Sequence, residues 1–169
     1  ETRPSEKQKI KSRIDAIQAD LQKDNHFSFE ISFSEVFRGC GGFDIVIANP
    51  PYVGEKGNKD KFDEVKNSEL KKYATGKMDL FYFFFHLSFD ITNKIGQISF
   101  ITTNYFVTAS GAKVLRKHIR DNCVIRKLIN FNELKVFETA LGQHNMLTFL
   151  RKGTNNFDTQ SLIIVCNER

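Results

Sequence analysis

The residues best suited to chemistry are Asn49, Pro50, Pro51 and Tyr52, which follow one another directly. Each proline fixes its own φ angle and biases the preceding residue towards an extended conformation. Prolines carry no N–H group, so the local polar atoms are mainly carbonyl oxygens, together with the side-chain oxygen of Asn49. Two rigid acceptors suit an NH2 group with two hydrogens, and Tyr52 offers a flat face on which a planar ring can stack.

An amine attached to an aromatic ring is a poor nucleophile because its lone pair is delocalised into the ring. Acceptors placed on its two hydrogens favour a more tetrahedral, electron-rich nitrogen in the transition state. This is electrostatic catalysis by preorganised groups, worth about a few kcal/mol per group. Such a site needs neither a metal nor a strong base. The plainer interpretation is that Pro50 and Pro51 simply end a strand.

The elements around these four residues predict where they lie. Residues 43–48 form a continuous apolar run, which predicts a strand buried on both faces. A helix is expected over 78–92, a strand over 97–102, and a helix from Thr108 or Ser110 to about residue 121. Three more strands are expected over 123–129, 145–151 and 161–166. This alternation predicts an α/β sandwich with a parallel sheet, and ligands bind such sheets outside the carboxyl ends of the strands.

The remaining segments are less regular. Residues 5–23 are expected to form a helix whose apolar stripe consists of Ile10, Ile14, Ile17 and Leu21. Alternating apolar residues over 27–33 predict a strand, and the glycines over 39–42 predict a loop. The polar residues 53–76 predict a mobile loop with at most a short helix, and residues 93–96 predict a turn. We therefore divide the chain into an N-terminal connector, 1–26, and a domain over 27–169.

Composition narrows the class of protein. The 169 residues suffice for one core, and the net charge of +5 is compatible with a nucleic-acid partner without requiring one. The three cysteines form no C-x-x-C pair and the four histidines are scattered, which predicts no metal site. The apolar run 80–87 is too short to cross a membrane and the N-terminus is charged, so we expect a cytoplasmic protein. The first residue is Glu1, and we expect a piece of a longer chain.

Four segments together resemble the TaqI-like adenine DNA methyltransferases, including the modification halves of fused type II restriction–modification enzymes. The segments are "FDIVIANPPYV", "GKMDLFYFFFHLSFDIT", "GQISFITTNYFVTASGAKVLRKHI" and "KVFETALGQHNMLTFLRKG". The resemblance covers about residues 27–152. It implies transfer of a methyl group from S-adenosylmethionine to the N6 amine of an adenine flipped out of double-stranded DNA. It also implies a Rossmann-like fold, of which this chain holds the C-terminal half of the sheet, mostly parallel with an antiparallel strand.

The resemblance assigns roles at the target base. Asn49 and the carbonyl of Pro50 would bind the adenine amine, with Pro51 completing the rigid turn. Tyr52 would stack on the flipped base, and Phe137 would pack on its other side. Three cationic residues on the helix before residue 121 are candidates for contacts with DNA phosphates, although a solvated helix face is the plainer interpretation: Lys113, Arg116 and Lys117.

On the cofactor side, the resemblance implies an aromatic residue from the helix over 78–92 against the adenine of S-adenosylmethionine. Phe84 is the best match. Packing in the core explains each aromatic residue of this helix equally well. Three others compete with it: Phe81, Phe83 and Phe85.

The glycine-rich cofactor turn of the family, D-x-x-x-G-x-G, has no match in the sequence. We therefore expect the cofactor side in the remainder of a parent chain, upstream of Glu1. The isolated chain is then expected to be inactive and to expose a sheet edge through which it can self-associate. Two alternatives stay open. One is methylation of RNA bases or of a protein glutamine, and the other is a non-catalytic module for DNA binding or assembly.

Overall fold

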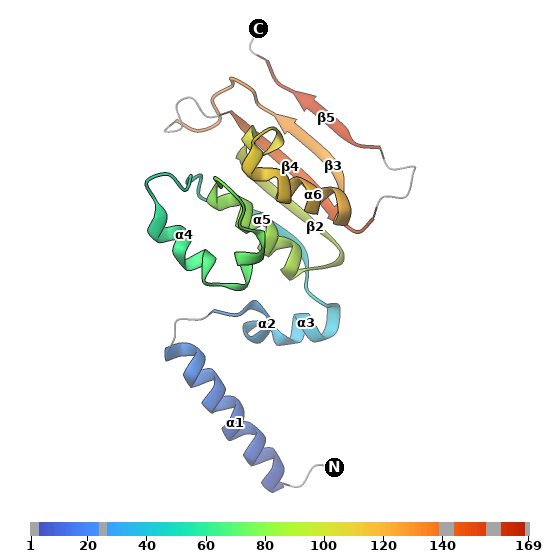
Figure 1. Ribbon diagram of the computed structural model, residues 1–169. Helices are drawn as coiled ribbons and strands as arrows, with labels where there is room; N and C mark the ends of the chain where they lie inside the picture. The colour runs from blue at the N-terminus through green and yellow to red at the C-terminus, as the bar shows by residue number, and fades with distance from the viewer. Residues whose placement is uncertain (1–3, 24–26, 139–143, 155–159, 168–169) are drawn as a thin grey trace.

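The computed structural model describes residues 4–23, 27–138, 144–154 and 160–167. Its centre is a five-stranded sheet in the order β1-β2-β4-β3-β5 (Figure 1). The strands are β1 (Phe43–Ala48), β2 (Thr92–Thr103), β3 (Cys123–Asn130), β4 (Asn145–Lys152) and β5 (Leu162–Val165). β1 pairs in parallel with β2, and β3 with β5, whereas β4 is antiparallel to both of its neighbours. The predicted mixed fold, mostly parallel with one antiparallel strand, is confirmed.

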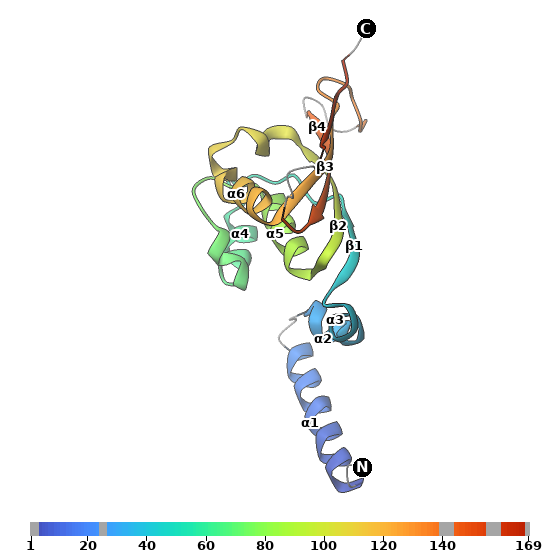
Figure 2. The ribbon, with the colours of Figure 1, turned by 90° about the vertical axis from the view of Figure 1, so that its right-hand side faces the viewer.

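Three helices cover one face of this sheet: α4 (Lys59–Lys66), α5 (Leu80–Ile91) and α6 (Lys113–Asn122) (Figure 2). The core lies between α5 and β2, where the rings of Phe85 and Phe100 stack with their centroids 4.3 Å apart. Both side chains are at most 1% exposed. The predicted helix over 78–92 is therefore confirmed within two residues at each end, and its nearly continuous apolar sequence reflects burial on most sides.

The opposite face of the sheet carries no helix among the described residues (Figure 2). Ile45 and Ile47 of β1 are 61% and 77% exposed there, whereas Val46 and Ala48 pack against the core on the other face. The prediction that residues 43–48 are buried on both faces is wrong for the described chain. Alternate side chains of a strand point to opposite faces, and here one of those faces has no covering layer.

The N-terminal part is helical. α1 (Pro4–Lys23) forms as predicted and projects away from the sheet (Figure 1). α2 (Phe29–Ser32) replaces the strand expected over 27–33, so that prediction is wrong, and α3 (Ser34–Cys40) extends into the loop expected over 39–42. The reason is a spacing of four: the rings of Phe29, Phe33 and Phe37 all surround Phe43, with centroids 6.2, 5.2 and 5.7 Å from its own.

Three other boundaries differ from the predictions. Residues 93–96 belong to β2 instead of a turn, and residues 53–76 contain α4 and the short 3-10 helix η1 (Glu69–Tyr73). The buried ring of Phe62 anchors α4, with its centroid 6.1 Å from that of Phe83 on α5. α6 begins only at Lys113, after the 3-10 helices η2 (Asn104–Val107) and η3 (Ser110–Ala112). A Cβ atom on Gly111 would lie 1.7 Å from the carbonyl oxygen of Lys77, so only glycine fits this contact.

Candidate functional site

The predicted site lies at one edge of the sheet. β1, β2 and β3 run in the same direction, so their carboxyl ends, at Ala48, Thr103 and Asn130, lie at the same edge. The Asn-Pro-Pro-Tyr segment follows β1 directly at this edge. Within it Asn49 is exposed, Pro50 is buried and Tyr52 is half-buried. The fold therefore leaves the side chain of Asn49 exposed, while Pro50 behind it is packed.

The hydroxyl of Tyr52 ties the tetrapeptide to β2. It lies 2.9 Å from Oδ1 of Asn49 and 3.1 Å from the carbonyl oxygen of Ile101, and its single hydrogen can be donated to either oxygen. Burial raises the pKa of Tyr52, so the phenol stays protonated as a donor at neutral pH. Its ring and that of Phe81 are nearly perpendicular, with their centroids 6.3 Å apart. Asn49 and Tyr52, which the sequence predicted to act together, are in direct contact.

The chain after Tyr52 is also held in place. The N–H of Leu80 donates to the carbonyl of Val53 at 2.8 Å, and the N–H of Glu55 donates to Met78 at 3.0 Å. Between these two contacts lies Asp79, whose pKa is raised because burial outweighs the nearby backbone N–H groups. Lys66 contacts Glu55 and lowers the pKa of that carboxyl group. These contacts fix the exit of the Asn-Pro-Pro-Tyr turn to the start of α5.

The aromatic residues of α5 differ sharply in exposure. Phe81, Phe83 and Phe85 are at most 2% exposed, whereas Phe84 is 37% exposed. The first three are therefore core residues, and Phe84 is left as the phenylalanine of this group that a ligand can reach. Phe137 is half-buried and lies in the connection that follows β3, at the same edge of the sheet as Asn49.

The three cationic candidates on α6 are not equivalent. Nη1 of Arg116 donates to the carbonyl oxygens of Phe106 and Ala109, each at 2.7 Å, so this guanidinium holds the connection between β2 and α6. Lys117 is paired with Asp121 one turn later on the same helix. Lys113 is exposed. A role for these residues in DNA binding stays a prediction.

Sequence reasoning missed a group of polar residues at the same edge. Nδ2 of Asn104, just after β2, donates to Oδ1 of Asn130 at the end of β3 over 3.2 Å. The backbone N–H of Asn104 donates to the carbonyl of His144 at 2.8 Å. The available signal was their position, since each asparagine lies where a strand ends, and open α/β sheets in general bind ligands at that edge.

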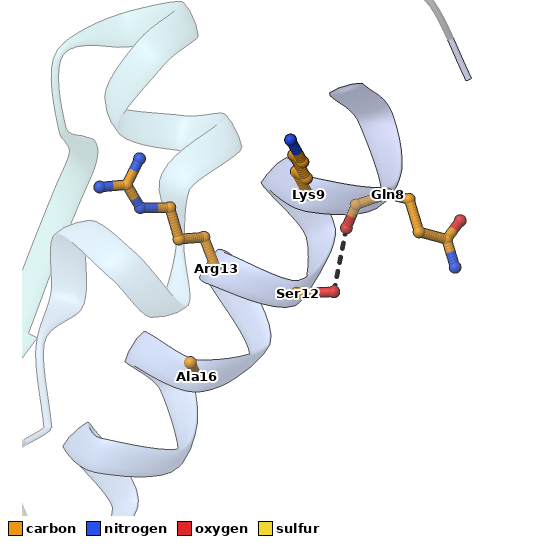
Figure 3. Close-up of a pocket in the computed structure, with 5 residues that line it drawn as sticks. All are labelled: Gln8, Lys9, Ser12, Arg13 and Ala16. Carbon is orange, nitrogen blue, oxygen red and sulfur yellow. Dashed lines mark hydrogen bonds between the residues drawn. The ribbon is translucent and has the colours of Figure 1, made fainter. Parts of the chain in front are cut away.

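Elsewhere, a hollow on the surface of α1 is lined by residues of that one helix. Figure 3 shows Ser12 donating to the carbonyl of Gln8 at 3.0 Å, beside Lys9, Arg13 and Ala16. Because α1 stands apart from the sheet, this hollow takes no part in the site (Figure 1).

Within the described ranges, no group of three or more potential metal ligands occurs. No helix in that part of the chain combines the length and apolar character needed to cross a membrane.

The fold is that of the class I S-adenosylmethionine-dependent methyltransferases. A Listeria monocytogenes protein assigned to this class superposes with a TM-score of 0.52 at 17% identity, over 75% of this chain and 38% of that one. The DrdV protein from a DrdV–DNA complex superposes with a TM-score of 0.53 at 17% identity, over 82% of this chain and 16% of that one. At these identities the likeness concerns the fold alone.

Sequence comparison identifies the family. Residues 1–137 match the Eco57I restriction-modification methylase family, and the chain belongs to it. The type II methyltransferase M.HincII of Haemophilus influenzae is 37% identical over 130 residues, which are 72% of this chain and 26% of that protein. The type II restriction enzyme and methyltransferase RM.Eco57I of Escherichia coli is 25% identical over 117 residues, 68% of this chain and 12% of that protein. The chain thus spans about a quarter or less of these two relatives.

Proposed function

We propose that this chain forms the target-base side of an S-adenosylmethionine-dependent methyltransferase that modifies the N6 amine of adenine in double-stranded DNA, within a restriction–modification system. The observation that carries the proposal is the arrangement of Asn49 and Tyr52 at the carboxyl end of β1, where the hydroxyl of Tyr52 lies 2.9 Å from Oδ1 of Asn49. Membership of a restriction-modification methylase family supports DNA as the substrate.

The two acceptors act on the amine as follows. A carboxamide oxygen has two lone pairs, so Oδ1 of Asn49 can accept from Tyr52 and from one amine hydrogen together. The carbonyl of Pro50 accepts the second amine hydrogen. Both bonds strengthen as the nitrogen becomes tetrahedral and positively charged, which lowers the barrier to attack. S-adenosylmethionine, when bound, supplies an electrophilic methyl group on a sulfonium.

Stacking supplies the second part of the site. Extruding a base from a duplex costs a few kcal/mol of unpairing and unstacking, part of which an aromatic pocket recovers. Tyr52 offers one face of such a pocket and Phe137 the other. The Tyr52 hydroxyl donates its hydrogen to Asn49 or to Ile101, and this restricts the ring before the base arrives, so little side-chain entropy remains to be lost on binding.

For the cofactor, the chain provides part of a site. The exposed ring of Phe84 fits a contact with the adenine of S-adenosylmethionine. The glycine-rich turn typical of this class has no match in the 169 residues. We therefore propose that residues 1–169 alone bind S-adenosylmethionine weakly and transfer no methyl group. Isothermal titration calorimetry tests this, and micromolar binding by the isolated chain would contradict it.

The main test uses the full-length protein that contains this chain. It is expressed in a bacterial host that lacks its own adenine methyltransferases, and the host DNA is examined for N6-methyladenine by single-molecule sequencing. We expect methylation at one short sequence, loss of the signal for Asn49→Ala, and full methylation for Asn122→Ala, an exposed control on α6. Unmethylated DNA, with methyl transfer to RNA or to a protein glutamine instead, would overturn the proposal.

A further inference from the structure

We propose that Asn104 and Asn130 are positioning residues, which fix the segment that carries Phe137 to the same strand that fixes Tyr52. This inference rests on the function proposed above. It assigns to two residues that contact neither the base amine nor the cofactor the task of setting the space between the two stacking rings.

The pair bridges two strands that are not neighbours. In the sheet, β4 lies between β2 and β3, and its first residue, Asn145, pairs with Thr103 of β2. The 3.2 Å contact from Nδ2 of Asn104 to Oδ1 of Asn130 therefore passes over the start of β4. Both side chains are half-buried, where a hydrogen bond is less exposed to competition from water. The carboxyl ends of β2 and β3 are thus joined directly.

The same pair controls the direction of the chain after β3. Oδ1 of Asn130 also accepts from the backbone N–H of Asn132 at 3.1 Å. Asn132 has a φ angle of +51°, in the left-handed region that asparagine tolerates better than most residues. The carbonyl of Asn132 lies 2.7 Å from Nδ1 of His144. These bonds fix a sharp turn a few residues before Phe137, so the turn determines where residues 131–138 leave the sheet.

The end of β2 is the common support. The carbonyl of Ile101 lies 3.1 Å from the hydroxyl of Tyr52, and three residues later the backbone N–H of Asn104 donates to His144. The short stretch from Ile101 of β2 to Asn104, just after it, therefore holds Tyr52 directly and holds the connection of Phe137 through Asn104. Because stacking on a base requires a fixed spacing between the rings, a support shared by both rings sets that spacing in advance.

The opposite end of β2 offers a matched control. There Nδ2 of Asn93 donates to Oδ1 of Asp44 at 2.6 Å, and Oδ1 of Asn93 accepts from the N–H of Ile95 at 3.1 Å. This asparagine joins β2 to another strand and accepts from a backbone N–H two residues later, as Asn130 does. It lies at the amino ends of the strands, away from Tyr52. Asn93→Ala therefore removes comparable bonds without touching the proposed support.

The experiment uses the full-length protein and its mapped target sequence, in a duplex with 2-aminopurine in place of the target adenine. Extrusion of this base raises its fluorescence. We expect Asn104→Ala and Asn130→Ala to lower the fluorescence increase by about tenfold to a hundredfold. On the same duplex with adenine at the target position, they are expected to lower kcat to a similar extent, with the KM for S-adenosylmethionine unchanged. Asn93→Ala is expected to lower the melting temperature of the protein by about as much as Asn104→Ala or Asn130→Ala does. Its fluorescence increase and its kcat are expected to equal those of the unmodified protein.

The donor and the acceptor of the hydrogen bond between Asn104 and Asn130 can be tested separately. Asn130→Asp keeps an acceptor for Asn104 and for the N–H of Asn132, so it is expected to retain extrusion. Asn104→Asp loses the donor and is expected to behave like Asn104→Ala. Normal fluorescence in Asn104→Ala, or an equal loss in Asn93→Ala, would overturn the positioning role while leaving DNA methylation by the unmodified protein intact. Absence of DNA methylation in the unmodified protein would overturn both proposals.

Discussion

The two faces of the sheet differ in what they contribute to the molecule. On the face covered by α4, α5 and α6, Ile98 of β2 is fully buried, and its partner Val46 of β1 packs against the core. One residue further along β1, Ile47 is 77% exposed on the opposite face. The free energy of folding of the described chain therefore comes mainly from the covered face. The other face is apolar without being packed, a combination that parallel sheets normally avoid.

The strongest test of this comparison is Phe85→Ala on the covered face. Phe85 is fully buried and stacks on Phe100, so its removal should lower the free energy of unfolding by about 3–5 kcal/mol. Urea denaturation of residues 1–169 measures this loss. Phe84→Ala, one position earlier on α5, should cost less than about 1 kcal/mol because that ring is 37% exposed. Equal losses for the two variants would contradict the division of α5 between core residues and an exposed Phe84.

A smaller loss of unfolding free energy, which appears as the pH falls, should come from two histidines on the covered face. His86 is fully buried, stacks on Tyr73 with centroids 3.7 Å apart, and has its Nδ1 2.9 Å from Nδ1 of His118. Burial lowers the pKa of His86 to about 3, with His118 and Lys72 adding to the effect. Burial also lowers the pKa of His118.

Because the pKa of His86 is lower in the folded state than near 6.5 in the unfolded chain, the unfolded state binds more protons in acid. The stabilisation is complete above about pH 6.5 and is lost as the pH falls towards 3. Between pH 7 and pH 5, His86 should account for about 2 kcal/mol of lost stability. His86→Phe keeps a stacked ring without a titrating group, so its unfolding free energy should decline less steeply. An unchanged pH profile in this variant would contradict the assignment.

The smallest change in the free energy of unfolding is expected for residues on the face of the sheet that α4, α5 and α6 do not cover. Ile47→Ser should change the free energy of unfolding of residues 1–169 by less than about 0.5 kcal/mol, because most of this side chain is already in water. The self-association expected earlier involves a sheet edge, and sedimentation velocity on the same variant tests whether this apolar face takes part in it as well. A loss above about 1 kcal/mol, dependent on protein concentration, would show that this face is packed against a second copy in solution.

Much of the fold could be predicted because its patterns are local. The run from Phe43 to Ala48 and the apolar helix after Met78 each indicate their own structure, and their order implies the parallel sheet. The exposure of Ile47 could not be predicted, since a continuous apolar run does not reveal which face has a covering layer. The helices α2 and α3 were missed because polar residues between the phenylalanines imitate a strand, while the spacing of Phe29, Phe33 and Phe37 is helical.

The contacts of the candidate site are also of two kinds, those that a local motif predicts and those that only the tertiary structure creates. Asn49 and Tyr52 are three residues apart, so their contact follows from a local motif. Asn104 and Asn130 are 26 residues apart and meet because β4 places their strands at a fixed separation. Neither asparagine has a distinctive neighbour in the sequence. Pairs of this kind depend on topology, which a reading of local patterns does not supply.

The position of β4 also has a consequence for the order of folding. β1, α5 and β2 precede β3 and β4 along the chain, with α4 and η1 between β1 and α5, so they can assemble first during synthesis. β2 and β3 cannot take their final separation until β4, the fourth strand along the chain, inserts between them. The segment that carries Phe137 is therefore expected to reach its place late in folding. If the proposed function holds, a partly folded molecule lacks one wall of the pocket for the base, and the pocket is complete only when the sheet is.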